Sequence, residues 1–209
     1  KKLLAAYRGL ARQLTESRKA LAQQFEKNMM AQLCDLGMEK TVFQVAFAPK
    51  PEGKQLMPQP IGDDTVEFMI SPNPGEPMKP LSKIASGGEL SRIMLALKSV
   101  LAQVDDIDTM VFDEVDSGIS GHAAGRVGTL MRSIADKRQV LCVTHLAQIA
   151  ACGHSHLLVQ KSVSDGRTYT VVTDLAEADR LQELARIMGG AVTDTTLSAA
   201  AELRSRAVT

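Results

Sequence analysis

The stretch TMVFDE, residues 109–114, decides the fold that this sequence predicts. Its first four residues are apolar or β-branched and form a short strand, and the carboxylates of Asp113 and Glu114 follow directly. A helical pattern over residues 122–136 and a second apolar strand, residues 140–143, come next. This alternation of helix and apolar strand predicts an α/β domain whose parallel sheet is covered on both faces.

Further elements are predicted on both sides of this centre. A helix is expected over residues 87–103 and a short one over 146–152. Strands near 156–161 and 168–173 are separated by an Asp-Gly dipeptide, which is typical of a hairpin turn. The other expected elements are strands over residues 41–47 and 65–70 joined by the loop 48–64, an extended connector over 71–82, and terminal helices over about 177–188 and 194–206.

The first 36 residues contain no proline and carry a repeating apolar pattern. The spacing alternates between four and three as far as residue 21, which is typical of a coiled-coil seam, and then becomes four throughout. The residues at these positions are Leu3, Tyr7, Leu10, Leu14, Ser17, Leu21, Phe25, Met29 and Leu33. We interpret residues 1–36 as the end of a coiled-coil arm and residues 37–209 as a globular lobe. The alternative is an ordinary amphipathic helix.

The charge is balanced overall but not along the chain. The 209 residues carry 24 basic and 24 acidic side chains, whereas residues 1–50 carry nine basic and four acidic ones. A uniformly basic nucleic-acid coat is therefore excluded, but a local patch is not. Only 3% of the residues are aromatic, which argues against stacking platforms for single strands. Arg12, Arg18 and Lys19 are candidate contacts to DNA phosphates.

Cysteine use and hydropathy indicate a cytoplasmic protein without a membrane partner. The three cysteines are widely spaced and form no CxxC pair, as in a reduced compartment. No apolar run approaches the ~20 residues that span a bilayer. The N-terminal start begins like a signal peptide, but Arg8 and Arg12 interrupt it.

The helix expected from residue 87 opens with the sequence SGGE. Ser86 and Glu89 have the spacing of a capping box, which any soluble helix can use. The capping box does not explain Gly87 and Gly88, because each glycine costs about 1 kcal/mol in a helix relative to alanine. Two glycines at a helix start are understandable if a phosphate approaches the backbone N–H groups there.

The ends of the two central strands carry the other candidate functional side chains. Ligands of α/β proteins bind at the carboxyl ends of the strands, where Asp113, Glu114 and His145 are expected. Asp113 suits Mg²⁺, and Glu114 suits the activation of an attacking water. His145 suits a hydrogen bond to a phosphate or to that water. The alternative is that one of the carboxylates caps the next helix.

Taken in order, these segments resemble the second lobe of an ATP-binding-cassette ATPase. In this resemblance ASGGE (residues 85–89) is similar to the signature motif and residues 110–113 to the Walker B strand. Glu114 matches the catalytic glutamate, residues 115–121 the D-loop, and His145 the switch histidine. The D-loop reads SGIS where transporter ATPases usually have SALD, so it lacks their closing carboxylate.

A closer resemblance is to the RecN family, bacterial DNA-repair proteins related to the SMC proteins. It extends over nearly the whole chain and includes terminal helices that generic cassette ATPases lack. The segments that carry it are ASGGELSR (85–92), FDEVDSGISG (112–121), VTH (143–145), LARIMGG (184–190) and TTL (195–197).

The resemblance implies the C-terminal lobe of an ABC/SMC-type ATPase head, with a parallel sheet core, a terminal hairpin and helices, and a coiled-coil end. It implies ATP and Mg²⁺ as cofactors, Asp113 as the metal ligand, and Glu114 and His145 as catalytic residues. The residues expected to bind nucleotide are Ser86, Gly87, Gly88, Glu89, Ser117 and Gly118.

The sequence contains no GxxxxGK[ST] motif, the phosphate-binding Walker A loop. Gly53-Lys54 does not qualify, since it is followed by Gln55 and lacks the upstream glycine. The resemblance therefore implies that the chain works with its own N-terminal Walker A lobe, and these 209 residues alone are expected not to hydrolyse ATP. Further implied partners are DNA and a second copy of the protein, joined through ATP-engaged heads. The implied role is recombinational repair of double-strand breaks at the bacterial nucleoid, where ATP binding holds or tethers DNA and hydrolysis releases it.

Three other interpretations remain open. The chain is a non-catalytic scaffold if the lobe is inactive and the coiled-coil arm binds a partner. A serine hydrolase would use Ser120, His145 and an Asp, but GISG (residues 118–121) is not the GxSxG elbow. A metal module would use Cys152, His154 and His156, whose spacing differs from that of structural zinc sites.

Overall fold

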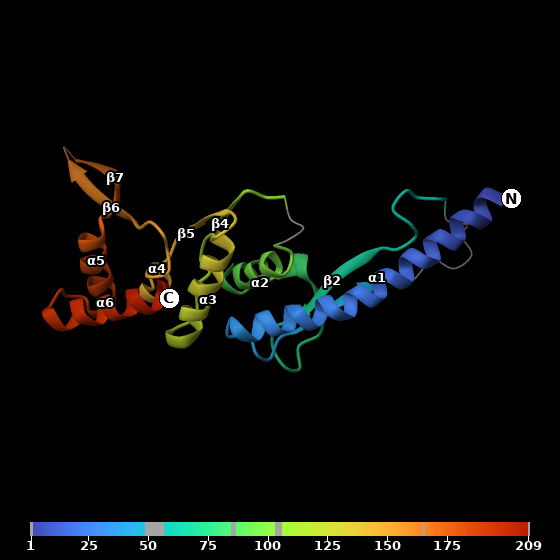
Figure 1. Ribbon diagram of the computed structural model, residues 1–209, viewed down its shortest axis with the longest axis horizontal. Coiled ribbons are helices and arrows are strands. Elements are labelled where there is room, and N and C mark those ends of the chain that lie inside the picture. The colour runs from blue at the N-terminus through green and yellow to red at the C-terminus, as the bar shows by residue number, and fades with distance from the viewer. Residues whose placement is uncertain (1, 49–56, 85–86, 103–105, 165, 209) are drawn as a thin grey trace. The chain divides into compact units, whose positions relative to one another are not determined.

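The computed structural model describes residues 2–48, 57–84, 87–102, 106–164 and 166–208 (Figure 1). The chain forms two compact units. The first comprises Lys1–Ser86 with Ala96–Gln103, and the second comprises Gly87–Leu95 with Val104–Thr209. Helix α2 (Gly87–Val100) is therefore shared: its residues up to Leu95 belong to the second unit, and those from Ala96 onward belong to the first.

The first unit combines one long helix with a small antiparallel sheet. Helix α1 spans Lys2–Asp35, and the sheet order is β1-β2-β3, followed by a single 3₁₀ turn. The phenylalanines Phe25, Phe43 and Phe68, with ring centroids 5.5–5.9 Å apart, join α1 to the sheet. The two longer strands confirm the sequence prediction to within one residue. The bounds are β1 Val42–Phe47, β2 Val66–Ser71, β3 Lys79–Pro80 and η1 Leu81–Lys83.

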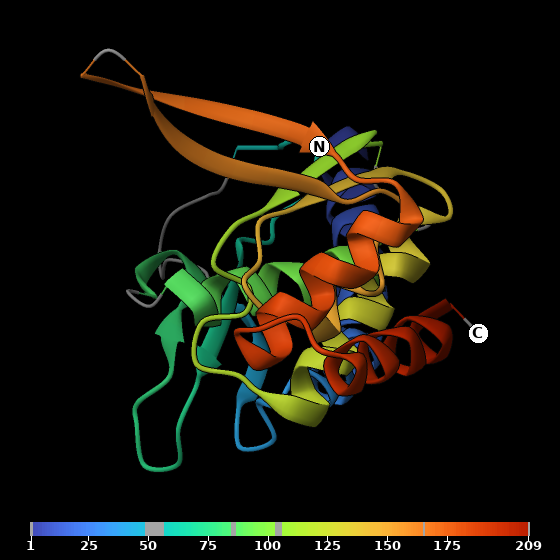
Figure 2. The same cartoon turned by 90° about the vertical axis from the view of Figure 1, so that its left-hand side faces the viewer.

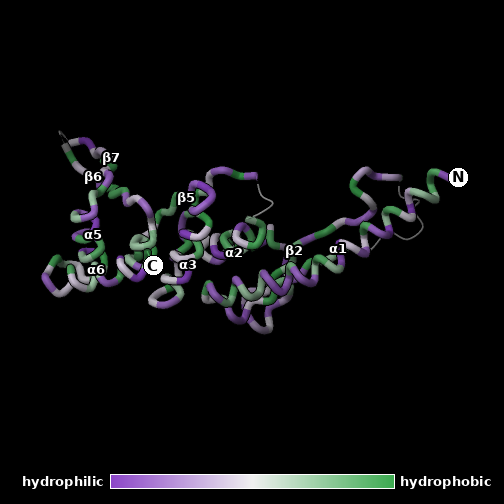
Figure 3. Tube along the Cα trace, in the orientation of Figure 1, coloured by the Kyte–Doolittle hydropathy of each residue, from purple (hydrophilic) through white to green (hydrophobic). Residues whose placement is uncertain are grey.

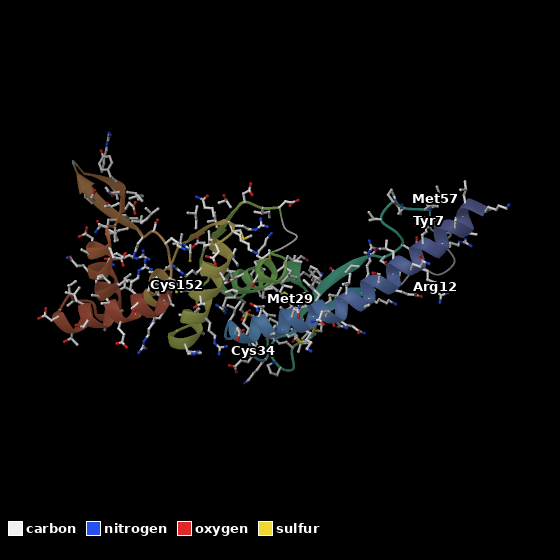
Figure 4. All side chains as sticks on the ribbon, viewed as in Figure 1. Tyr7, Arg12, Met29, Cys34, Met57 and Cys152 are labelled. Carbon is white, nitrogen blue, oxygen red and sulfur yellow. The ribbon has the colours of Figure 1, made fainter. Side chains whose placement is uncertain are left out.

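The predicted seam of α1 is divided between two faces of the helix. Tyr7 contacts the segment 57–64, where its hydroxyl donates to Asp63 at 2.6 Å (Figure 4 labels Tyr7 and Met57). Leu3, Leu10 and Leu21 stay 67–88% exposed on a neighbouring face. The hydropathy colouring of α1 alternates accordingly (Figure 3). The exposed leucines keep the spacing that a partner helix would require.

The second unit follows the predicted alternation. Strands β4 and β5 pair in parallel, with Thr109 opposite Gln139 and Phe112 opposite Cys142. The long antiparallel strands β6 and β7 form the predicted hairpin (Figure 2). The bounds are β4 Thr109–Phe112, α3 Gly121–Ala135, β5 Gln139–Cys142, α4 Ala147–Ala150, β6 Leu157–Ser164, β7 Arg167–Asp174, α5 Glu177–Gly189 and α6 Asp194–Val208.

The prediction that the parallel sheet is covered on both faces is wrong for the part of the chain that the structure describes. Met110 and Phe112 are buried, each with 6% exposure. Val111, which lies between them in β4, and Val143, which directly follows β5, are 66% and 63% exposed, because successive strand residues point to opposite faces. One face is therefore packed, and the other presents apolar side chains to solvent.

The turn after α4 is fixed by three arginines from three helices. Arg132 of α3 donates to the carbonyl of Cys152, while Arg180 of α5 and Arg204 of α6 both donate to that of Gly153. Arg180 is only 2% exposed. Arg180 also donates to the carbonyl of Ala150 and Arg204 to that of Ala151, which the end of α4 leaves without helical partners. These bonds tie the terminal helices to the segment that follows His145.

Among the described residues, no helix is both long enough and apolar enough to cross a membrane.

Candidate functional site

The parallel register brings the predicted side chains to one edge of the β4–β5 sheet. Asp113 and Glu114 directly follow β4, and His145 lies three residues after the end of β5. Phe112 and Cys142, the last residues of the two strands, are paired with each other. All three predicted side chains are exposed, as a site for a diffusible ligand requires.

Glu114 has an unusual backbone conformation. Its φ of 57° makes it the one non-glycine residue with positive φ in the described ranges. The conformation is held locally, because its N–H donates to the side chain of Asp113 at 2.9 Å and its carbonyl accepts from Ser117 N–H at 3.0 Å. A left-handed residue costs about 1–2 kcal/mol, and such strain is often found at functional sites.

The start of α2 packs against the segment 114–117. A Cβ on Gly88 would lie 2.7 Å from Ser117 Cβ and 3.0 Å from Ser117 O. A Cβ on Gly87 would collide with the Glu114 carboxylate. Close packing therefore accounts for Gly88, which is buried, while Gly87 remains exposed.

The other residues predicted to bind nucleotide lie near this helix start. Glu89 is half-buried in the first turn of α2, and Ser86, with its capping box, lies outside the described residues. Ser117 and Gly118 are exposed, and Gly118 has a φ of 74° that favours glycine. The structure thus brings Gly87, Gly88 and Ser117 together with Glu114.

Two residues that the sequence analysis did not single out hold this arrangement. Ser91 Oγ donates to the carbonyl of Asp113 at 2.8 Å. Arg92, 7% exposed, donates to the carbonyl of Ser117 at 2.6 Å. Ser91 and Arg92 lie three and four residues after Gly88 and thus on the same helix face. This spacing is the sequence signal from which the two residues could have been identified.

A third such residue is Asp116, which is 4% exposed. Its Oδ2 accepts hydrogen bonds from Thr144 Oγ1 at 2.6 Å and from the backbone N–H of His145 at 2.9 Å. The same oxygen lies 3.1 Å from His145 Nδ1. Asp116 therefore connects the segment after β4 to the segment after β5.

The carboxylates create a negative potential at the strand ends. Burial, and then the charges of Asp116 and Asp113, raise the pKa of Cys142 to about 12. In the described chain, no three His, Cys, Asp or Glu side chains gather as a metal cage. Mg²⁺ usually takes only one or two carboxylates and completes its shell with water and phosphates, so Asp113 fits a Mg²⁺ that arrives with a nucleotide.

The structure gives little support to two of the alternatives. Cys152, His154 and His156 do not form a metal cluster within the described ranges. Ser120 precedes α3, and no hydrogen bond joins it to His145 in the part of the chain that the structure describes. A serine nucleophile would need that base within about 2.6–3.2 Å.

Comparison with known structures gives the fold. The SMC head domain of Pyrococcus yayanosii, solved with a coiled coil and joint, superposes with a TM-score of 0.55 at 20% identity, covering 82% of this chain and 30% of that one. The SMC head domain of Pyrococcus furiosus, solved bound to the C-terminal domain of ScpA, gives 0.52 at 20% identity, covering 81% and 39%. The chain therefore has the fold of part of an SMC head domain.

Comparison of sequences gives relatives among the RecN proteins. No protein-family model matches the chain. The DNA repair protein RecN of Vibrio cholerae is 43% identical over 194 residues, which cover 92% of this chain and 34% of that protein. RecN of Bacillus subtilis is 39% identical over 208 residues, covering 94% and 36%. Over nearly all of its length the chain is thus similar in sequence to RecN proteins, and it spans about a third of their length, consistent with their C-terminal portion.

Proposed function

We propose that this chain is the C-terminal half of the head of an SMC-like ATPase that acts in the repair of DNA double-strand breaks. The observation that carries the proposal is the convergence of Asp113, Glu114 and His145 at the ends of two parallel strands, with the glycines of α2 beside them. The similarity to RecN proteins supports the biological role.

Each residue has a chemical role in this proposal. Asp113 would hold Mg²⁺, which when bound neutralises charge on the phosphates. Glu114 would orient the attacking water and accept its proton, and His145 would hydrogen-bond the γ-phosphate. The exposed N–H group at Gly87 would face the γ-phosphate held by a second head, as helix N-termini suit anions.

We infer that the Walker A lobe comes from an N-terminal part that the relatives contain. The chain spans about a third of their length. The apolar side chains Val111, Leu141 and Val143 are 45–66% exposed on one face of the β4–β5 sheet. In the described ranges β5 pairs only with β4, so its other edge is free for a further strand. The N-terminal lobe would cover this face and this edge.

The arm and the DNA contact are further parts of the proposal. The exposed Leu3, Leu10 and Leu21 suit a partner helix that completes a coiled coil. The guanidinium of Arg18 forms an ion pair with the carboxylate of Asp64, with an N–O distance of 3.0 Å, and the ammonium group of Lys19 lies over the ring of Phe47. Arg12 forms an exposed pair with Glu16, which is worth little and is easily exchanged for a phosphate. DNA contact is therefore proposed for Arg12 rather than for all three cations.

The test compares the wild-type protein, joined to its N-terminal part, with Glu114→Gln. ATP turnover should fall by a factor of at least about 10², because the water loses its base. ATP-bound dimers should accumulate on size exclusion, since hydrolysis no longer reopens them. The matched control is Glu177→Gln, an exposed acid on α5.

Three outcomes would contradict the proposal. One is turnover at the wild-type rate by Glu114→Gln, and another is robust hydrolysis by these 209 residues alone. The third is dimerisation without any ATP hydrolysis by the complete protein, which would favour the scaffold interpretation.

A further inference from the structure

We propose that Asp116 is a positioning residue for His145, and that it fixes which ring nitrogen of His145 is offered to the nucleotide. This inference rests on the proposed function, because it assigns His145 to the phosphate. Asp116 itself lies outside the set of residues that the motifs single out as catalytic. The geometry around its carboxylate carries the inference.

The carboxylate of Asp116 lies against both the backbone and the ring of His145. One oxygen, Oδ2, lies 2.9 Å from the backbone N and 3.1 Å from Nδ1 of His145. Two contacts from one residue to one acceptor fix both the backbone and the ring. A carboxylate oxygen without a proton attracts an N–H group rather than a nitrogen lone pair, so the 3.1 Å contact favours the ring form with its proton on Nδ1.

The other ring nitrogen is then defined by elimination. With the proton on Nδ1, neutral His145 presents a lone pair at Nε2, and the protonated ring presents a donor there. The His145 side chain is 76% exposed, and in the described residues no hydrogen bond engages Nε2. A polar partner that fixes one histidine nitrogen commonly sets the function of the other.

The position of Asp116 is in turn fixed by its neighbours. It is 4% exposed, and Thr144 Oγ1 donates to the same oxygen at 2.6 Å. The carbonyls on either side of Asp116 accept hydrogen bonds from Arg92 of α2, at 3.4 Å and 2.6 Å. The start of α2 is therefore connected to the ring of His145 through Val115, Asp116 and Ser117, three consecutive residues of one loop.

The first test is a double-mutant cycle on ATP turnover by the complete protein. Asp116→Ala should lower kcat about 10- to 100-fold, the usual loss when the partner of a functional histidine is removed. The KM for ATP should stay within about twofold. In a His145→Ala background the same substitution should cost less than about twofold, because its target is absent.

A matched control separates positioning from a loss of structure. Thr144→Val removes another hydrogen bond to the same carboxylate, together with the acceptor of Leu146 N–H at 3.0 Å, but leaves the contact between Asp116 and the ring of His145, so its kcat should fall less than about threefold. Equal losses from Asp116→Ala in the wild-type and His145→Ala backgrounds would overturn the inference. A loss from Thr144→Val as large as that from Asp116→Ala would overturn it as well.

The second test reads the proton directly and needs no hydrolysis. In protein labelled with ¹⁵N-histidine, the His145 signals are assigned by their absence from His145→Gln. At pH 8 we expect Nδ1 to be protonated and Nε2 to be unprotonated, and Asp116→Asn, which keeps the side-chain volume, to shift this distribution. A wild-type ring protonated on Nε2 would refute the inference. Inactivity of the complete protein would refute the proposed ATPase but leave this readout intact.

Discussion

The paired glycines of α2 give the sharpest prediction about stability. Alanine at Gly88 would place a Cβ 2.7 Å from Ser117 Cβ and 3.0 Å from Ser117 O. Neither atom is the end of a flexible side chain, so the backbone of the loop must move. Gly125, in the second turn of α3, is the matched control, because a Cβ there meets nothing within 4 Å.

The expected magnitudes follow from two opposing effects. Alanine is favoured over glycine in a helix by up to about 1 kcal/mol, and this gain applies to both positions. Overpacking costs about 1–3 kcal/mol, and this loss applies to Gly88 alone. Gly125→Ala should therefore stabilise by up to about 1 kcal/mol, while Gly88→Ala should destabilise by about 1 kcal/mol.

Urea unfolding followed by circular dichroism measures both changes. The midpoint should rise for Gly125→Ala and fall for Gly88→Ala at an unchanged m-value. Equal midpoints for the two variants would show that the loop yields without cost, and the packing explanation of Gly88 would then be wrong. Gly87→Ala provides an internal comparison. It meets only the movable carboxylate of Glu114, so its stability should change little.

Three further predictions concern strain, pH and thiol reactivity. Glu114→Gly should raise the free energy of unfolding by about 1 kcal/mol in urea titrations, because glycine adopts the positive φ without strain. Burial, followed by the charge of Arg180, lowers the pKa of His156, so the unfolded chain takes up its proton at a higher pH than the folded one. Stability should accordingly fall as the pH drops through about 6.5, and His156→Gln should weaken this dependence in unfolding curves measured between pH 7.5 and 5. Iodoacetamide at pH 8 should modify Cys34, which is exposed (labelled in Figure 4), well before Cys142, whose thiol stays protonated. Peptide mapping that finds Cys142 modified first would contradict this prediction.

The order of elements was predictable because each element has a local signal. The strand over residues 109–112 and the helix start at Gly87 fall where apolar runs and glycines indicate. The neighbours of α1 were not predictable, because Asp63 and Asp64 lie in a segment without any periodic pattern. Sequence spacing identified the seam but gave no information on which of its residues meet that segment.

The site divides in the same way between local and long-range signals. Asp113, Glu114 and His145 were identified because strand ends are recognisable from the sequence. Asp116 was not, because its function depends on contacts with residues 28 and 29 positions further along the chain. The positive φ of Glu114 also escapes sequence reasoning, since glutamate has no preference for that conformation.

The two glycines show how a motif can combine two different requirements. The sequence favoured a single explanation, the approach of a phosphate to the backbone of both residues. In the structure Gly88 is buried against the loop that carries Asp116, whereas Gly87 is exposed beside Glu114. Gly88 therefore serves the packing that holds the loop, and only Gly87 is open to a ligand. If both glycines contacted a phosphate directly, the burial of Gly88 would have to be relieved first, and the hydrogen bonds of Arg92 oppose that movement.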